Sequence, residues 1–312
     1  MNFQQLEYIV AIDQFKSFSK AAEHCHVTQA TLSAMVKKLE EELNVILFDR
    51  KAYPIITTDM GLEIILQAKK VLYESSELKN LVQVAKKTVA GHVKIGIIPT
   101  VANALLPKIL KPTLEKYPQL YVHIVELTTQ NLIKQLKEGN IDIGILATPL
   151  QIEEIEENIL YYETLMVYGS FESEKKYLLP EELKDHKIWM LEEGHCLREQ
   201  FIQLCSLKEK KLSPHNFHFE ANSFETLLNL VDEFGGLTLI PELYYQTLQP
   251  SQKQKVCLFK SPIPVREISL VYFRPFAKNR IIEALTNDIK NIVNQKLISN
   301  NYSKNELIIV PS

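Results

Sequence analysis

The feature that most restricts the fold is a segment without proline that extends from Asp59 to about Val89. Within it, apolar and small side chains recur in alternating steps of four and three residues, at Ile64, Ala68, Val71, Ser75, Leu78, Val82 and Ala85. This heptad spacing predicts one long helix with a single apolar seam. Because an isolated helix has nothing of its own to cover such a seam, we expect two copies of the chain to pair along it.

The part of the chain before this helix has the pattern helix, helix, turn and helix. Apolar residues at helical spacing follow Phe3, a second short helix begins near Ser19, and Thr28 is placed to cap a third. The third helix has an apolar stripe and an opposite face of small, hydrogen-bonding side chains. Residues 48–57 then predict two short strands around a turn. The side chains expected to contact DNA are Thr28, Gln29, Thr31, Ser33, Lys37, Arg50 and Lys51.

The charge of the chain gives no support to DNA binding, so that prediction depends on the pattern alone. The formal net charge is -3, and residues 1–60 hold six Lys and Arg against eight Asp and Glu. No apolar run approaches the roughly 20 residues of a membrane span, and the N-terminus lacks the pattern of a secretion signal. We therefore expect a cytoplasmic protein without a membrane partner.

After Gly91 the periodicity changes to alternating strands and helices, which predicts an α/β fold with mainly parallel strands. The expected strands are 92–98, 120–127, 141–147, 163–169, 187–191, 216–220, 236–240 and 267–273. The expected helices are 103–116, 130–138, 196–205, 223–234 and 278–296. The tail from about Ser299 is polar and is expected to be loosely held, although its last apolar residues are able to dock.

These patterns divide the chain into three parts. We expect a winged helix-turn-helix at 1–58, a linker helix that dimerises at 59–90, and a regulatory domain at 91–312. The last is expected to consist of two subdomains with a cleft between them. The first takes about 91–161 and 268–312, and the second about 162–267.

Specific motifs in the first part resemble a known family. Phe18-Ser19-Lys20-Ala21-Ala22, Val27 to Ser33 and Leu47-Phe48-Asp49-Arg50 are similar to the DNA-binding domain of LysR-type regulators. The resemblance implies a winged helix that binds a palindromic site on double-stranded DNA, a dimerising linker and a regulatory part resembling periplasmic solute-binding proteins. It also implies a homodimer or homotetramer that contacts RNA polymerase.

A second motif resembles the hydrogen peroxide-sensing branch of that family. It consists of Gly194-His195-Cys196-Leu197-Arg198 followed by Cys205. The resemblance implies that Cys196 is the peroxidatic thiol and Cys205 the resolving thiol, joined by a reversible disulfide. It further implies that Thr100, Thr129, His195, Arg266 and Asp142 surround the peroxide or the thiolate.

The residues around Cys196 also support a reactive thiol directly. A thiol pKa falls near cations and at helix N-termini, and Cys196 follows Gly194-His195 at an expected helix start, two residues before Arg198. If one helix spans Cys196 to Cys205, its nine-residue rise of roughly 13 Å holds the sulfurs too far apart to bond. A disulfide must then remodel this segment, roughly residues 195–225.

Other interpretations remain open. Two cysteines on one amphipathic helix are often packing residues, and the chain is then a LysR-type regulator that binds a small molecule in its interdomain cleft. A thiol peroxidase is a third possibility, which the winged helix disfavours; we expect no enzyme activity. Cys25 and Cys257 are expected to be core residues. Neither His24 and His26 beside Cys25 nor His215 with His218 supplies four ligands, so we expect no metal and no cofactor.

Overall fold

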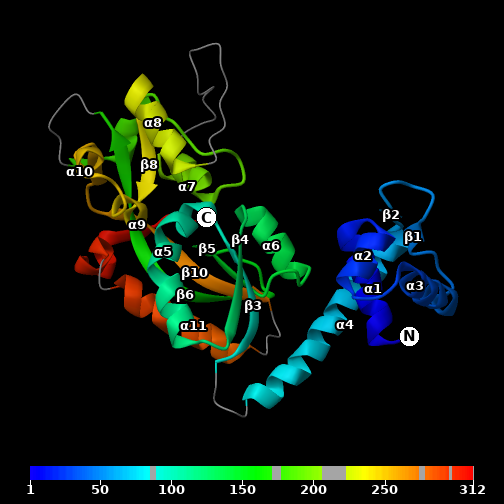
Figure 1. Cartoon of the computed structure of the whole chain (residues 1–312). Coiled ribbons are helices and arrows are strands. Elements are labelled where there is room, and N and C mark those ends of the chain that lie inside the picture. The colour runs from blue at the N-terminus through cyan, green and yellow to red at the C-terminus, as the bar shows by residue number, and fades with distance from the viewer. Residues whose placement is uncertain (85–88, 171–176, 206–222, 274–277, 295–296, 312) are drawn as a thin grey trace. The chain divides into compact units, whose positions relative to one another are not determined.

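The structure is a computed structural model of the 312-residue chain, and it describes residues 1–84, 89–170, 177–205, 223–273, 278–294 and 297–311 (Figure 1). The chain divides into two compact units, Met1–Lys87 and Thr88–Ser312, which are described separately. The strand predicted at 216–220 and the histidines at 215 and 218 lie outside the described residues. No helix among the residues described is long and apolar enough to cross a membrane.

The first unit is a winged helix-turn-helix followed by a long helix. Its elements are α1 (Phe3–Phe15), α2 (Phe18–His24), α3 (Gln29–Leu43), β1 (Phe48–Asp49), β2 (Ile56–Thr57) and α4 (Asp59–Val84). Asn2, Ser17 and Thr28 precede the first three helices, and each side chain accepts a hydrogen bond from a backbone N–H of the first turn. β1 and β2 pair antiparallel and form the wing, so the predicted pattern is confirmed.

The core of this unit corrects the prediction for the linker helix. Ala68 is 3% exposed and Ile64 is partly buried, and both pack into the core formed by α1, α2 and α3. The first two positions of the predicted seam are therefore covered by the chain's own helices, because the helix begins directly against α1, whereas Val71, the third position, is 36% exposed. Leu62 and Leu66, on another face, are exposed. The side chains of Leu78 and Val82, and Ala85, lie outside the described residues.

The second unit contains an α/β sheet with two long strands that contribute to both halves of the unit. Its elements are β3 (Gly91–Ile97), α5 (Pro99–Lys116), β4 (Leu120–Glu126), α6 (Thr129–Lys137), β5 (Ile143–Thr148), β6 (Ile155–Gly169), β7 (Tyr177–Leu178), η1 (Pro180–Asp185), α7 (Cys196–Leu204), α8 (Phe224–Phe234), β8 (Leu237–Pro241), α9 (Glu242–Tyr245), α10 (Pro250–Lys253), β9 (Val256–Phe259), β10 (Ile263–Phe273), α11 (Asn279–Val293), η3 (Ile298–Asn301), η4 (Lys304–Glu306) and β11 (Leu307–Ile309). α5 begins four residues before the predicted start because Pro99 occupies its first turn, where proline is favoured.

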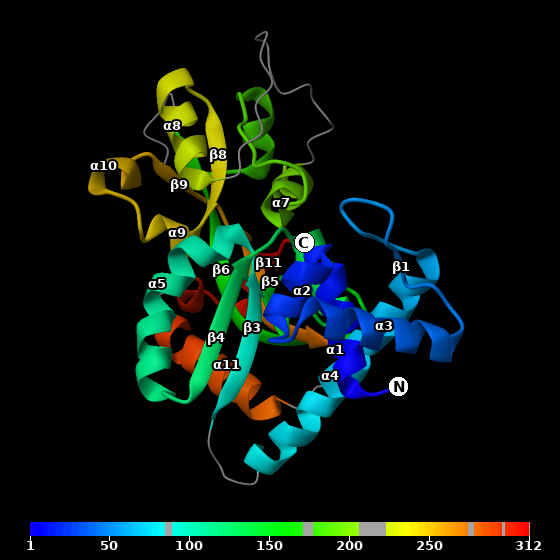
Figure 2. The ribbon, with the colours of Figure 1, turned by 45° about the vertical axis from the view of Figure 1, so that its right-hand side comes forward.

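The strand order is β4-β3-β5-β10-β6-β9-β7, with β11 on β10 and β8 on β6. β3, β4 and β5 are parallel, whereas β10 runs antiparallel to β5 and β6. One hydrophobic core surrounds β3, β4, β5, α5 and α11, and it includes Tyr161 and Ile268. A second core surrounds α7, α8, β8 and β9, and begins on β6 at Leu165. Figure 2 shows α8 and α10 beside β8 and β9, and α5 beside α11. The strands β6 and β10 thus connect two cores.

Three sequence expectations for this unit are wrong. The strands are not mainly parallel, because β10 runs antiparallel to β5 and β6, and β6 also runs antiparallel to β8 and β9. Residues 187–191 form no strand: Ile188 makes one isolated bridge to Leu237, and the chain then turns toward α7. The C-terminal tail is not loose. β11 pairs parallel with β10, and the Val310 N–H donates to the Val265 carbonyl at 2.9 Å. Burial of Val310 in the second core supplies the apolar contact that holds it.

Candidate thiol site and DNA interface

Cys196 lies at the first residue of α7 and is 5% exposed. Gly194 turns the chain with a φ of +90°, a conformation that glycine adopts without strain, and His195 occupies the N-cap position. The side chain of Cys196 packs into the core of β3, β4 and β5, although most of α7 packs into the second core. The helix start therefore places this thiol where the two cores meet.

Burial raises the pKa of the Cys196 thiol above its ordinary value of 9.0, and this is the largest influence on it. The charge of Arg266, the Thr129 side chain, and the backbone N–H groups of Ala147 and Leu197 act in the opposite direction. The expectation of a lowered pKa is thus wrong for the closed, reduced protein. These four groups favour the thiolate, but the cost of desolvation is larger. Entry of water into the site reduces that cost and therefore favours the thiolate over the thiol.

Arg266 is the cation that acts on Cys196, and it is fully buried on β10. Its Nε donates to Glu163 Oε1 at 2.9 Å, its Nη1 to Thr100 Oγ1 at 3.1 Å and its Nη2 to the Thr100 carbonyl at 3.0 Å. Thr100 stands in the first turn of α5. The structure thus brings Thr100 and Arg266 together with Cys196. Glu163 was not among the residues predicted from the sequence, although a carboxylate beside the apolar run 165–167 was a signal for it.

Thr129 is the second hydroxyl of the site and begins α6. Its Oγ1 is buried and has no hydrogen bond of normal geometry among the described residues, yet its proximity lowers the pKa of Cys196. Two glycines let α6 approach: a Cβ at Gly144 would lie 2.5 Å from a Leu132 side-chain carbon, and one at Gly96 also meets Leu132 within 3.4 Å. The hydroxyl is thus held beside the sulfur.

His195 and Arg198 do not have the electrostatic role that the sequence suggested. His195 is buried, and this burial lowers its pKa against the smaller, opposite effect of Glu192, which favours the neutral imidazole. Arg198 Nη1 donates to the Leu191 carbonyl at 3.0 Å and fixes the loop before α7. Both residues shape the helix start, and the positive charge at the sulfur comes from Arg266.

The expectation that Asp142 is near the sensor thiol is wrong. Asp142 accepts the Lys94 N–H at 2.8 Å and pairs with Lys278 Nζ at 2.8 Å, at the amino end of β5. Ala147, whose N–H acts on Cys196, is five residues further along the chain. At about 3.3 Å per residue, the two positions are roughly 16 Å apart. Asp142 therefore connects the amino end of β5 to β3 and to Lys278.

Cys205 is the C-cap of α7 and is 1% exposed in the second core. Burial, and then the charge of Glu181, raise its pKa to about 12. All four cysteines are free thiols, and Cys257 is buried while Cys25 is half-buried. With Cys196 and Cys205 at opposite ends of one helix, a disulfide requires α7 to unfold or shift.

The predicted DNA-contacting residues lie on α3 and the wing. Thr28, Gln29, Thr31 and Lys37 are exposed, and Ser33 is half-exposed. Thr28 also caps α3 through the Thr31 N–H. The wing residues are Arg50 and Lys51, which follow β1 and are exposed.

Arg50 differs from the other candidate residues because it has structural partners. Its Nη2 donates to Glu40 Oε2 at 2.6 Å, its Nη1 to Ser33 Oγ at 3.3 Å, and the guanidinium lies 5.1 Å from the centre of the Phe18 ring. Arg50 thus connects the wing to α3 while part of its surface stays exposed.

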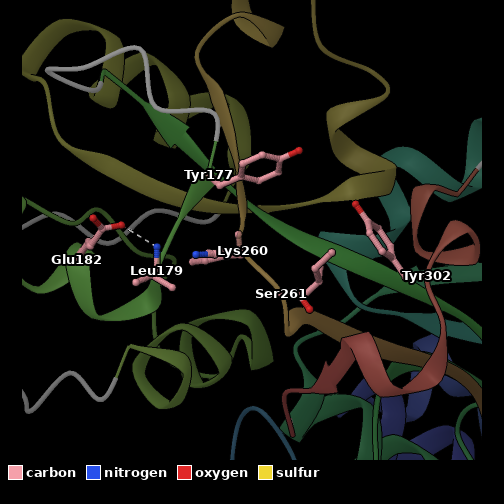
Figure 3. Close-up of a pocket in the computed structure, with 8 residues that line it drawn as sticks. Tyr177, Leu179, Glu182, Lys260, Ser261 and Tyr302 are labelled. Atoms are coloured by element: carbon pink, nitrogen blue, oxygen red, sulfur yellow. Dashed lines mark hydrogen bonds between the residues drawn. The ribbon is translucent and has the colours of Figure 1, made fainter.

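A hollow of about 640 Å³ lies at the edge of the second core, far along the sheet order from β3, β4 and β5. Figure 3 shows Tyr177 above Lys260, with Ser261 and then Tyr302 to the right of Lys260. None of its lining residues belongs to the Cys196 site. Within the described residues, no cluster of three or more His, Cys, Asp and Glu side chains forms a metal site.

The fold and the two sites define a regulator with a helix-turn-helix unit and a separate α/β regulatory unit. Residues 3–62 match the bacterial regulatory helix-turn-helix proteins of the lysR family, and residues 86–290 match the LysR substrate binding domain. The chain belongs to the LysR family, which confirms the predicted fold class and family.

Several similar proteins within the family have names or structures that refer to hydrogen peroxide. A hydrogen peroxide-inducible genes activator from Haemophilus influenzae is 35% identical over 94% of this chain and 99% of its own length. Full-length OxyR of Pseudomonas aeruginosa, solved as a variant, superposes with a TM-score of 0.76 and 31% identity, covering 93% of this chain and 98% of that one. An OxyR variant of Corynebacterium glutamicum, solved with hydrogen peroxide bound, gives a TM-score of 0.62 and 27% identity over 97% and 96%.

Proposed function

We propose that this chain is a hydrogen peroxide-sensing transcriptional regulator of oxidative-stress genes, switched by a reversible Cys196-Cys205 disulfide. The observation that carries the proposal is the position of Cys196 at the start of α7, beside Arg266, Thr100 and the Thr129 hydroxyl. The names of the relatives from Haemophilus influenzae and Corynebacterium glutamicum agree with it.

The proposed chemistry has two balanced steps. The Cys196 thiolate attacks one oxygen of hydrogen peroxide, the O–O bond breaks, and the leaving hydroxide takes a proton to become water. Thr100 and Thr129 orient the peroxide, and Arg266 stabilises the thiolate. The sulfenic acid then reacts with the Cys205 thiol, forming the S–S bond and releasing a second water. His195 and Arg198 support the helix start in this scheme, and Asp142 has no part in it.

The signal passes from the thiols to DNA. Since the disulfide cannot form across an intact α7, oxidation remodels this helix and the residues after it. We propose that the change alters the contact between subunits of a homodimer or homotetramer. The linker helices then change the spacing of the winged helices on a palindromic operator. We propose RNA polymerase as a further partner and the cytoplasm as the location of the protein. We also propose domain boundaries at 58/59 and 90/91.

The decisive experiment is a footprint on one operator before and after peroxide, with wild type, Cys196→Ser and Cys257→Ser. Wild type and the Cys257→Ser control should change their footprint, whereas Cys196→Ser should keep the reduced pattern. Cys205→Ser should form a trappable sulfenic acid at Cys196 without a lasting change. If Cys196→Ser changes as wild type does, the sensor lies elsewhere.

The same wild-type protein and cysteine variants also test two other functions. A LysR-type regulator of a small molecule would show a footprint that depends on a metabolite and is indifferent to Cys196→Ser. The hollow beside Tyr177 and Tyr302 is one place among the described residues with room for such a ligand. A thiol peroxidase would consume peroxide continuously with a thioredoxin-type reductant, whereas a sensor needs one oxidation per signal; we propose that the chain is not an enzyme.

A further inference from the structure

Glu163 is a buried carboxylate whose place in the sheet ties it to the thiol site. It stands on β6, and the register of the antiparallel ladder sets it directly opposite Arg266 on β10. Both side chains are 0% exposed. Directly opposed residues of an antiparallel pair have their Cβ atoms about 5 Å apart, which lets the two charges meet without distortion of either strand.

Both oxygens of this carboxylate are occupied by groups from different elements. Oε1 accepts the Arg266 Nε proton at 2.9 Å, and Oε2 accepts the N–H of Leu243, in the first turn of α9, at 2.8 Å. A guanidinium is planar and its donors are fixed in one fork. With Nε held by Glu163 and both terminal nitrogens held by Thr100, the plane of Arg266 is determined.

The pairing also limits what Arg266 does electrostatically. A negative charge 2.9 Å from Nε offsets much of the field of the guanidinium in a region that water does not reach. The other buried carboxylates described nearby differ: Glu242 accepts from Thr164 and from the Ile298 N–H, and Glu267 accepts from the hydroxyls of Thr148 and Tyr162. Glu163 is therefore placed to act on the sulfur through Arg266.

We propose that Glu163 is a positioning residue that fixes the plane of Arg266 and restrains the charge that the guanidinium exerts on Cys196. The inference rests on the proposed function, since it deepens the regulation of the same site. Glu163 sets how reactive the reduced thiol is at rest. A chain with an uncompensated Arg266 would hold more thiolate and would react at lower peroxide concentration.

The test measures the rate at which iodoacetamide alkylates Cys196 in the full reduced chain as a function of pH, with the modified peptide followed by mass spectrometry. Glu163→Gln keeps the size and removes the charge, and we expect the midpoint of the pH profile to fall by about one unit. Glu267→Gln is the matched control, because Glu267, the residue after Arg266 on β10, is also buried but accepts its side-chain hydrogen bonds from Thr148 and Tyr162. Its midpoint should equal that of wild type.

A second variant covers the case in which Glu163→Gln does not fold. Glu163→Asp keeps the charge but withdraws the carboxylate from Nε by one methylene, so a smaller fall in the midpoint is expected. An unchanged or raised midpoint in a folded variant of Glu163 overturns the proposal. Alkylation requires neither peroxide nor DNA, so this result is independent of the footprint that tests the proposed function.

Discussion

Lys37 and Arg50 are both expected to contact the DNA backbone, but the structure holds them differently. Lys37 is 69% exposed and pairs with Glu41 at 3.6 Å, an arrangement of little energetic value. Arg50 is paired with Glu40, whose other oxygen accepts the Leu47 N–H. The charge of Lys37 is thus available to DNA, while the charge of Arg50 also holds the wing.

The two variants should therefore differ in stability. Lys37→Ala should weaken operator binding and reduce the slope of log affinity against log salt by about one, with an unchanged Tm. Arg50→Ala should weaken binding. It should also reduce the free energy of unfolding by about 1 kcal/mol and so lower the Tm. Binding titrations at several salt concentrations and thermal unfolding separate the effects. Lys111→Ala, which removes a similar exposed pair with Glu115 from the other unit, is the control; equal affinity of all three variants and wild type would contradict the interface.

What the sequence reveals about single residues depends on the distance over which they act. The residues next to Cys196 predict that it begins a helix, and in the structure α7 begins at Cys196. The pairing of Glu163 with Arg266 joins positions 103 residues apart, and no local pattern encodes which buried charges meet. Asp142 shows the converse error. The family resemblance suggested a position near the thiol, but Asp142 precedes the first residue of β5, whereas Ala147, which acts on Cys196, lies near the other end of that strand.

Among the elements, α7 has a contact that bears on the proposed switch. The side-chain amide of Gln200, in the middle of α7, donates to the Val310 carbonyl at 2.9 Å, and Gln200 is fully buried. Val310 is held by β10 and by the second core. The C-terminal tail therefore stabilises α7 in its helical form.

Val310→Asp should release this tail, because an unpaired carboxylate is not tolerated at a position 5% exposed. The loss of the buried valine should cost about 2 kcal/mol of unfolding free energy. The backbone amides of α7 should exchange with deuterium faster in the reduced variant. Ile309→Asp, at a neighbouring position 46% exposed, is the matched control and should behave as wild type. Equal exchange in the two variants would show that the tail does not stabilise α7.

Periodicity predicted most helices and strands, because each depends on its own apolar pattern. It failed where an element depends on a distant partner. Residues 187–191 have a strand pattern, yet Ile188 and Leu191 make only isolated bridges, that of Ile188 to Leu237. The tail lacks a strong pattern, yet β10 gives β11 a free edge to pair with. The start of the α4 seam was assigned to a second copy because the sequence does not show that Ile64 and Ala68 pack into the core of α1, α2 and α3.

At the scale of the whole molecule, the exposed apolar residues of α4 indicate association. Leu62 and Leu66 are 46% and 42% exposed, and their spacing of four places them on one face. We expect light scattering to give the mass of a dimer or tetramer at micromolar concentration. Leu62→Asp combined with Leu66→Asp should lower that mass, whereas Lys37→Ala should not. A monomeric wild type would contradict the oligomer and the palindromic operator together.

The two sulfurs of the proposed switch belong to different hydrophobic cores, Cys196 to that of β3, β4 and β5 and Cys205 to that of α7 and α8. Oxidation must withdraw at least one of them, so the packing lost counts against the disulfide in the thiol-disulfide equilibrium. For a two-electron couple, each 1.4 kcal/mol of packing lost makes the midpoint potential less negative by about 30 mV. Tight packing of the reduced thiols therefore makes the disulfide a stronger oxidant. We therefore expect the packing of the two cores to favour return of the proposed switch to its reduced form once peroxide is removed.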